Sequence, residues 1–366
     1  DQIIEKFYDL YASYGKKLFY YQEKIIDDFD DILIKLLKPI QKYLIENKED
    51  DNYEDLLNLY FDINKYLKIS DYYTEGFYSI LAYDETYDDI YFEIKCVDPA
   101  QVLKNTYSFA RTSVFFSATL SPMDYFVRML GANDALRLKL DMPFANNNYD
   151  IYVREISTRY RDRNSNVTII SDSINEFVKS KVGNYFIFFP SYSYMMDVYE
   201  DFSSRYDDKI LLQDRFMNEK DVSKFLGKFD KDSNKTAFLV LGGIFSEGVD
   251  LIGDRLIGAM IISVGMPGVS YERNLIKEHF DKIGLNGFDY SYTYPGINKI
   301  FQAAGRVIRS EEDRGIIYLI DDRFTSYKYR MLYPKHWRKK EIKIVNEAKD
   351  FRKEIKMFWG DDSEKK

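Results

Sequence analysis

Apolar residues recur at helical spacing in the first part of the chain. Steps of three or four residues join Ile26, Phe29, Leu33, Leu36, Ile40 and Leu44. This spacing predicts one buried helix face. Pro39 lies inside the stretch and is expected to kink or interrupt the helix, because proline has no N–H and crowds the preceding turn. A second apolar stripe between Leu56 and Leu67 predicts another helix, so we expect a helical segment over residues 1–75.

The pattern of apolar positions then changes from helical to strand-like. Residues 77–83 and 90–97 alternate and are rich in Tyr, Phe and Ile, which predicts two strands, as in a hairpin. Short continuous apolar runs follow at 113–118, 185–190, 236–241, 257–264 and 315–320, separated by helical stretches that include 171–182, 191–204 and 271–283. Strands of this kind that alternate with helices are typical of parallel sheets covered on both faces. The sequence therefore predicts an α/β fold.

The length and a polar stretch suggest how the chain is divided. At about 150 residues per domain, 366 residues predict two or three domains. Residues 141–166 are polar and loop-like around one strand, so a boundary near residue 150 is expected. We therefore expect three parts, at 1–75, 76–150 and 151–366.

Charge is divided unevenly along the chain. The 52 Lys and Arg against 60 Asp and Glu give a formal charge of −8, which at first argues against a nucleic-acid partner. Residues 1–100 carry 23 acidic and 11 basic side chains, whereas residues 101–366 carry 37 and 41. The acidic excess thus belongs to the helical segment, and the slightly basic remainder is compatible with a nucleic-acid track.

Several classes of protein are disfavoured by what the sequence lacks. Cys96 is the only cysteine, and this excludes a disulfide framework or a multi-thiolate metal site in these residues. The two histidines, His279 and His336, argue against a histidine zinc site. No run of about 18 apolar residues predicts a membrane span. The sequence starts without Met and without a leader, so we expect a cytoplasmic protein of which these residues are a piece.

Two candidate segments follow predicted strands, where ligands bind in open α/β sheets. SATLSP at 117–122 has small hydroxyl residues that suit a turn bonded to a neighbouring loop, although a turn and helix cap explain it equally well. FFPSYS at 188–193 offers Ser191 or Ser193 as a helix cap that presents N–H groups to a phosphate. Tyr192 can stack on a base. A plain N-cap is the alternative for this segment.

Two further segments are richer in chemistry. GGIFSEGVDL at 242–251 pairs two glycines, which let the backbone approach a ligand, with polar side chains, although a glycine-rich turn also has structural explanations. QAAGRVIRS at 302–310 is expected to be helical, which places Gln302, Arg306 and Arg309 on one face. Two guanidinium groups and a carboxamide on one face suit a nucleoside triphosphate.

Together and in this order, the four segments resemble the superfamily 2 helicases of the XPD/DinG (Rad3-related) group. In that resemblance SATLSP matches motif III, FFPSY motif IV, GGIFSEGVDL motif V and QAAGRVIRS motif VI. ISVGMP at 262–267 and DDRF at 321–324 match two further family segments. The matches span about 98–335, whereas residues 1–90 match only in position and in being helical.

The resemblance implies a fold and an activity. It implies a RecA-like parallel-sheet motor domain 2 over 151–366, the closing strands of motor domain 1 over 76–150, and an α-helical arch-like segment over 1–75. The implied function is that of an ATP-dependent DNA helicase that couples ATP hydrolysis to 5′–3′ translocation on single-stranded DNA or a forked duplex. ATP and Mg²⁺ would lie between the two motor domains.

The resemblance also implies roles for single residues. Arg306 and Arg309 would contact the γ-phosphate as arginine fingers with Gln302 beside them, and such a finger contributes about 10³–10⁵ in rate. The nucleotide side of motif V would consist of Gly243, Glu247, Gly248 and Asp250. The residues that face the nucleic acid or couple it to hydrolysis would be Ser117, Ala118, Thr119, Ser191 and Tyr192.

The other half of an ATP site does not occur in the sequence. It contains no G-x-x-x-x-G-K-[ST] and no Asp-Glu-x-His box. In the family these elements precede the arch, so we expect a carboxy-terminal portion that lacks metal ligands and hydrolyses no ATP alone. The missing amino-terminal half of motor domain 1 is then an expected partner. An iron–sulfur cluster, found in some family members, would have its cysteines upstream, so its presence is open.

Two other readings of the sequence stay open. One is a non-catalytic nucleic-acid-binding or interaction module that keeps RecA-like architecture. The other is a translocase or nuclease-coupled ATPase from another branch of the superfamily. RNA as the track also stays open, because phosphate contacts and stacking do not choose the sugar.

Overall fold

The computed structural model describes residues 2–13, 15, 19–24, 29–84, 88–142, 148–245, 251 and 255–360. The chain divides into two compact units. The first consists of Asp1–Phe115, Val127–Ala135 and Ser270–Gly287, and the second of Phe116–Phe126, Leu136–Val269 and Phe288–Lys366. The domain limits expected at residues 75 and 150 stay a prediction, because these units group residues by packing. Among the described helices, none is long and apolar enough to cross a membrane.

The second unit is built on a seven-stranded sheet in which all neighbouring strands are parallel. In spatial order the strands are β10 (Ile342–Ile344), β4 (Tyr149–Arg154), β9 (Gly315–Ile320), β8 (Gly258–Ile262), β5 (Tyr185–Phe189), β7 (Thr236–Val240) and β6 (Ile210–Leu212). Four of the five apolar runs noted in the sequence form central strands of this sheet. The α/β fold with a parallel sheet is thereby confirmed.

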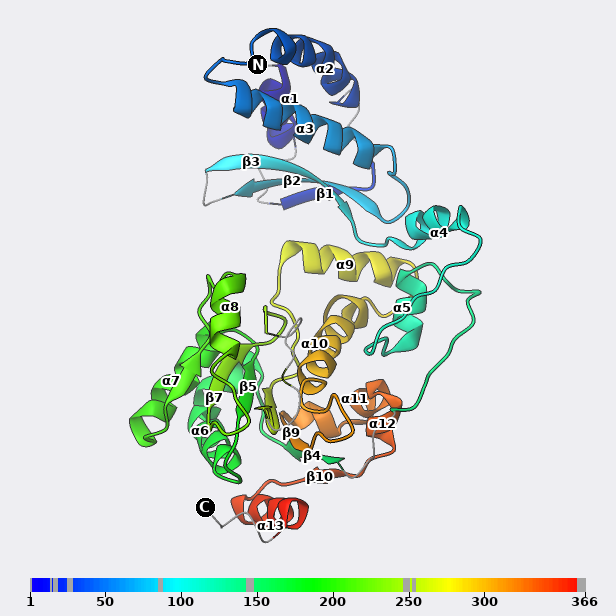
Figure 1. The fold of residues 1–366 in the computed structure, drawn as a ribbon. Coiled ribbons are helices and arrows are strands. Elements are labelled where there is room, and N and C mark those ends of the chain that lie inside the picture. The colour runs from blue at the N-terminus through cyan, green and yellow to red at the C-terminus, as the bar shows by residue number, and fades with distance from the viewer. Residues whose placement is uncertain are drawn as a thin grey trace. The chain divides into compact units, whose positions relative to one another are not determined.

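Helices cover both faces of this sheet. One face packs against α8 (Glu219–Leu226), α10 (Tyr294–Ala304), α11 (Tyr327–Leu332) and α12 (Lys335–Arg338). The other packs against α6 (Arg163–Val178), α7 (Tyr192–Arg205) and α13 (Ala348–Trp359). In Figure 1, β5 and β7 lie between α7 on one side and α10 on the other. Along β5, Phe186 and Phe188 enter the first core and Tyr185, Ile187 and Phe189 the second, so every residue of the strand is buried.

The first unit combines a small antiparallel sheet with helices. Its sheet has the order β1 (Phe19–Gln22), β2 (Phe77–Asp84) and β3 (Asp89–Cys96). Its helices are α1 (Gln2–Ser13), α2 (Phe29–Glu46), α3 (Tyr53–Ser70), α4 (Ala100–Ser108), the end of α5 (Met123–Met129) and α9 (Tyr271–Lys282). The expected pair of strands at 77–83 and 90–97 is confirmed as β2 and β3. The expected helix at 271–283 is α9, whose Leu275 packs among residues of β2.

Helix α2 continues through Pro39, so of the expected kink or interruption the interruption does not occur. The apolar stripe explains this outcome. Leu33 on one side of the proline and Ile40 and Leu44 on the other are buried in one core with Ile63 of α3. Burial of this face on both sides of Pro39 offsets the one backbone hydrogen bond that proline removes.

The run at 113–118 is not a strand, and this prediction was also wrong. Residues 112–117 are irregular, and the side chains of Val114 and Phe116 are 79% and 88% exposed. A strand needs a neighbour that pairs with its N–H and C=O groups. No described strand pairs with these residues, so their strand-like composition is not enough to form one.

Candidate nucleotide and nucleic-acid site

Helix α10 carries the start of the arginine segment but ends before its arginines. The helix runs to Ala304, and Gly305 is its C-cap, with its N–H bonded to the carbonyl of Phe301 at 2.9 Å. The next turn tightens, because the N–H of Arg306 bonds to the carbonyl of Ala303 at 3.2 Å. The expectation of one helical face for Gln302, Arg306 and Arg309 was therefore wrong. Gln302 lies in the last turn of α10, and both arginines follow the helix.

A buried carboxylate holds the backbone at Arg309. Asp313 is 2% exposed, and its Oδ2 accepts the backbone N–H groups of Arg309 at 2.5 Å and Ser310 at 2.7 Å. The side chain of Arg309 is half-buried, and burial lowers its pKa from the usual value. Sequence reasoning missed Asp313. The signal in the sequence was an acidic residue four positions after Arg309 and three after Ser310, which is close enough for its carboxylate to accept their backbone N–H groups.

The glycine turn after β7 lies against the side chain of Lys299 on α10. Gly242 has φ +72°, and a Cβ built on it would lie 2.7 Å from Cε and 3.0 Å from Nζ of Lys299. Lys299 precedes Gln302 by three residues on the same helix, so both side chains lie on one face. The predicted Gly243, next in the chain, lies instead against Gln213, because a Cβ built on it would be 3.1 Å from Nε2 of that side chain. Sequence reasoning missed Lys299. Glu247, Gly248 and Asp250 lie outside the described residues.

Residues of SATLSP and of the arginine segment line one cavity of about 330 Å³ within the second unit. The first segment contributes Ala118, Thr119 and Ser121, and the second contributes Ala304, Gly305 and Ile308. Ser117 is exposed, and its Oγ accepts the backbone N–H of Thr119 at 3.2 Å. Ser121 donates to the carbonyl of Leu332 at 3.1 Å. Two segments almost 190 residues apart in sequence therefore line the same cavity.

Ser191 acts as the helix cap that the sequence allowed. Its Oγ accepts the backbone N–H of Tyr194 at 3.3 Å at the start of α7. The next residue, Tyr192, is half-buried, and burial raises the pKa of its hydroxyl. The guanidinium of Arg215 lies 5.2 Å from the centre of the Tyr192 ring, in a cation–π arrangement.

A buried glutamine joins the ends of β5, β7 and β6, which are neighbours in the sheet. Gln213 is 5% exposed. Its Nε2 donates to the hydroxyl of Tyr192 at 2.6 Å, and its Oε1 accepts the N–H of Val240 at 2.8 Å. The Tyr192 hydroxyl in turn donates to the carbonyl of Asp214 at 3.3 Å. Sequence reasoning missed Gln213, because its partners lie more than 20 residues away.

DDRF at 321–324 follows strand β9 and contains an internal ion pair. Asp321 is fully buried and accepts two hydrogen bonds from Arg323, from Nε and Nη2, each at 2.7 Å. Thr158, after β4, also donates to Asp321. Burial alone would raise the pKa of Asp321, but the hydrogen bonds and charge of Arg323 outweigh it and hold the pKa below its usual value. This segment therefore ties the ends of β4 and β9 together.

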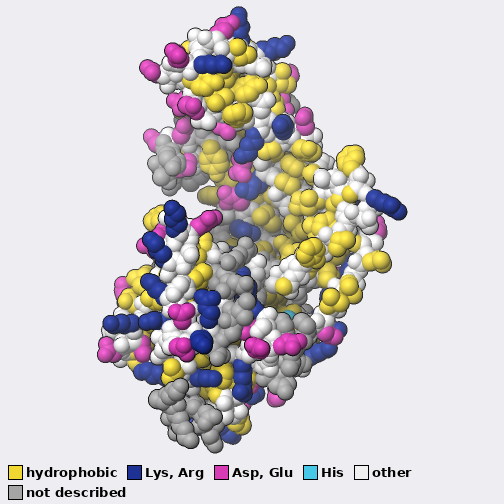
Figure 2. Space-filling view, viewed as in Figure 1, with side chains coloured by type: hydrophobic (Ala, Val, Ile, Leu, Met, Phe, Trp, Pro, Cys, Tyr) yellow, Lys and Arg dark blue, Asp and Glu magenta, His cyan; other side chains and the backbone are white. Residues whose placement is uncertain are grey.

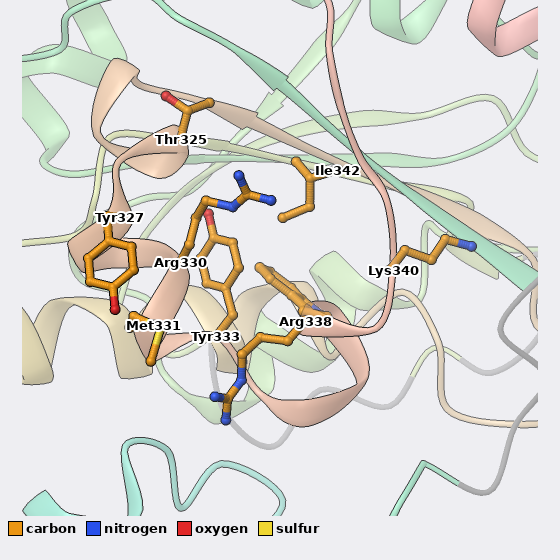
Figure 3. Close-up of a pocket in the computed structure, with 9 residues that line it drawn as sticks. Thr325, Tyr327, Arg330, Met331, Tyr333, Arg338, Lys340 and Ile342 are labelled. Atoms are coloured by element: carbon orange, nitrogen blue, oxygen red, sulfur yellow. The ribbon is translucent and has the colours of Figure 1, made fainter.

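A second cavity, of about 420 Å³, lies beside α11 and α12 and contains none of the residues that the sequence singled out. Figure 3 shows that the guanidinium groups of Arg330 and Arg338 point in different directions from this pocket. The two charges therefore do not converge on one ligand atom.

Several known proteins resemble this chain in sequence. The family model described as a helicase C-terminal domain matches residues 174–340. The DNA helicase YoaA of Escherichia coli K12 is 27% identical over 222 residues, 59% of this chain and 34% of YoaA. The XPD helicase subunit of Schizosaccharomyces pombe is 26% identical over 289 residues, 72% of this chain and 37% of XPD. The helicase CHL1 of Debaryomyces hansenii is 23% identical, covering 88% and 43% of the two chains.

Solved structures agree on the fold. An apo structure of XPD superposes with a TM-score of 0.59 at 18% identity and covers 88% of this chain and 63% of that one. Xpd4 of S. tokodaii superposes with a TM-score of 0.59 at 17% identity and covers 93% and 65%. The chain spans about a third to two-fifths of the length of the curated relatives named above. It carries a RecA-like helicase C-terminal domain and is a distant homologue of the XPD/Rad3, YoaA and CHL1 helicases.

Proposed function

We propose that this chain is the carboxy-terminal part of an ATP-dependent DNA helicase that couples ATP hydrolysis to translocation on single-stranded DNA. The observation that carries the proposal is the packing of the Gly242 turn against α10, the helix that leads to Arg306 and Arg309. A glycine turn next to cationic side chains suits a polyphosphate. The relatives YoaA and CHL1 are named ATP-dependent DNA helicases.

The proposed nucleotide roles concern the cationic side of an ATP site. Arg306 and Arg309 stabilise charge on the γ-phosphate, and Gln302 lies beside it. The motif V side of the site couples nucleotide binding to the contacts with DNA. It consists of Gly243, Glu247, Gly248 and Asp250. The half-buried arginines and the nearby Lys299 fit phosphate groups. Bound Mg²⁺ would neutralise phosphate charge, but within the described ranges no three acidic, His or Cys side chains gather around one point.

The proposed partner is a further α/β unit that carries the phosphate loop. Support comes from exposed strand-like segments. Leu136, Leu138 and Leu140 alternate with polar residues and are 103%, 75% and 79% exposed. Val114 and Phe116 are exposed in the same way. Apolar side chains on segments with unpaired backbone are typical of strands that complete a sheet with another unit.

The proposed nucleic-acid side consists of Ser191 and Tyr192 at the end of β5, with Ser117, Ala118 and Thr119 as coupling residues. The shared wall of SATLSP and the arginine segment supports this coupling, because a shift of one segment changes the packing of the other. The proposed track is single-stranded DNA.

The test compares the chain alone with the chain joined to a phosphate-loop unit. We expect the purified 366 residues to bind a DNA oligonucleotide in a salt-dependent manner and to release no phosphate from ATP. DNA-stimulated phosphate release should appear when the unit that precedes the arch in the helicase is supplied. Turnover by the 366 residues alone would contradict the division of the ATP site. Turnover that never appears with the added unit would favour the non-catalytic binding module.

A further inference from the structure

An exposed aromatic residue lies next to the motif IV tyrosine, on a loop that neither the sequence motifs nor the family match singles out. The loop follows β6 and comprises residues 213–218. Phe216 is 90% exposed, and the preceding Arg215 is exposed with its guanidinium over the ring of Tyr192. Among the described residues, no carboxylate forms an ion pair with Arg215, so its charge is available to a ligand.

The loop is held in place at both ends. Gln213 ties its start to β7 and to Tyr192. The N–H of Phe216 bonds to Oδ1 of Asp214 at 2.9 Å, and Met217 packs against the core. Asn218 then caps α8 in a capping box with Asp221. The exposure of Phe216 is therefore a property of an anchored loop rather than of a frayed one.

The loop lies at the edge of the sheet where the strand ends converge. β5, β7 and β6 are neighbours, and their carboxyl ends carry Tyr192, the Gly242 turn and this loop. Figure 2 shows Lys and Arg side chains gathered over α8, the helix that follows the loop. The exposed ring of Phe216 suits a base that stacks on it. The guanidinium of Arg215 and the further cations at this edge suit the phosphates of the same strand, whose charge they neutralise.

We propose that Tyr192, Arg215 and Phe216 form a stacking platform for single-stranded nucleic acid. Gln213 is the positioning residue that fixes Tyr192 and the loop relative to each other. Phe216 stacks on a base, and Arg215 contacts a phosphate from its place on the Tyr192 ring. This inference rests on the proposed function and extends its nucleic-acid side to a loop outside the motifs. The same features also suit a protein partner, and the tests below separate the two.

The first test uses tryptophan emission as a direct readout of stacking. The chain has two tryptophans, Trp337 and Trp359, which are 3% and 8% exposed, so Phe216→Trp introduces the one exposed indole. A dT oligonucleotide should quench the emission of Phe216→Trp and leave that of the wild-type chain nearly unchanged. Inorganic polyphosphate, which has charge but no bases, should not quench it.

The second test separates stacking from charge by affinity and salt dependence. Phe216→Ala and Phe216→Leu should each weaken oligonucleotide binding by roughly tenfold with an unchanged salt slope, because leucine is apolar but cannot stack. Phe216→Trp should retain wild-type affinity. Arg215→Ala should reduce the salt slope by about 0.7, as for one lost phosphate contact. Lys231→Ala, an exposed charge in the loop before β7 at the opposite edge of the sheet, is the matched control and should change neither value.

The outcomes distinguish this inference from the proposed function. If an oligonucleotide binds without quenching the emission of Phe216→Trp, and Phe216→Ala binds it with unchanged affinity, the stacking platform is overturned. The proposed function is left intact by this result. Affinity that Phe216→Leu retains and Phe216→Ala loses, with no quenching, would point instead to an apolar contact of the protein–protein type and also overturn the platform. A wild-type chain that binds neither DNA nor RNA contradicts both proposals.

Discussion

The side-chain amide of Gln213 donates to the hydroxyl of Tyr192 at 2.6 Å, and both residues follow strands whose carboxyl ends meet at one edge of the sheet. The carbonyl of the same amide accepts the N–H of Val240, at the end of β7, at 2.8 Å. One buried side chain therefore joins the segment that resembles motif IV to the end of β7, directly before the segment that resembles motif V.

Replacement of Gln213 by Ala should destabilise the second unit and weaken DNA binding together. The substitution leaves the N–H of Val240 without its side-chain acceptor, so we expect a loss of about 1–3 kcal/mol in the free energy of unfolding. Urea unfolding and oligonucleotide titration measure the two effects. Tyr192→Phe, which removes only the hydroxyl, should cost less. Gln101→Ala, at an exposed glutamine on α4, is the control and should be nearly neutral. Equal unfolding midpoints for the Gln213 and Gln101 variants would contradict the role of Gln213.

Loss of Arg306 should abolish turnover in the assembled helicase while DNA binding is retained. A finger that stabilises γ-phosphate charge contributes about 10³–10⁵ in rate, so Arg306→Ala should lower kcat by that factor. Arg306→Lys should recover little, because an ammonium lacks the planar fork of a guanidinium. Arg338→Ala removes an exposed arginine of the same unit and serves as control. Unchanged phosphate release by Arg306→Ala would remove this residue from the finger role.

The ion pair of Asp321 and Arg323 should make the stability of the second unit depend on pH in the acid range. The pKa of Asp321 in the fold lies below its usual value, so the carboxylate stabilises the fold above about pH 4 and the effect is lost as pH falls through the folded pKa. Asp321→Asn leaves a buried guanidinium poorly paired, and we expect a loss of about 3–5 kcal/mol at pH 7.

At pH 3 the difference between Asp321→Asn and wild type should shrink, as measured by urea unfolding at both pH values. Asp124→Asn, at an exposed ion pair with Arg137, should change stability by less than about 1 kcal/mol at either pH. A constant difference between pH 7 and pH 3 for Asp321→Asn would show that the charge of Asp321 is not the cause.

Gly242 should be intolerant of a side chain for two separable reasons. Its φ of +72° disfavours any L-residue, and a Cβ there would lie 2.7 Å from Cε of Lys299. We expect Gly242→Ala to cost about 1–2 kcal/mol from the backbone conformation alone. The addition of Lys299→Ala should recover only the part due to the close contact, and a double-mutant cycle measures that part. Gly268→Ala, where a Cβ has open space and φ is not positive, should be nearly neutral.

Local patterns along the chain were sufficient for most of the sheet. The runs at 185–190, 236–241, 257–264 and 315–320 are apolar at almost every position, because both faces of a parallel strand are buried. They became β5, β7, β8 and β9. The order of the four short motifs was likewise sufficient to indicate the helicase family, since motif residues lie close together in sequence.

Other features depended on contacts between residues far apart in sequence. The run at 113–118 has the composition of a strand, but no described strand pairs with it. Arg306 lies beyond α10 because the chain tightens at Gly305, although the spacing of the segment fits a helix. Pro39 stays inside α2 because α3 packs against the same apolar face on both sides of it.

The residues that hold the candidate site together could not be found from local pattern at all. Gln213, Lys299 and Asp313 look like ordinary polar residues of a loop or a helix in the sequence. Their roles arise from where the strands end in the folded sheet, which brings Gln213 to Tyr192 and Lys299 to Gly242. A polar residue acquires its partners only when folding buries it beside them, because a buried donor or acceptor needs a partner and an exposed one has water. Periodicity and motif order therefore predicted the parallel sheet and the resemblance to helicases, and the packing of distant segments decided the geometry of the site.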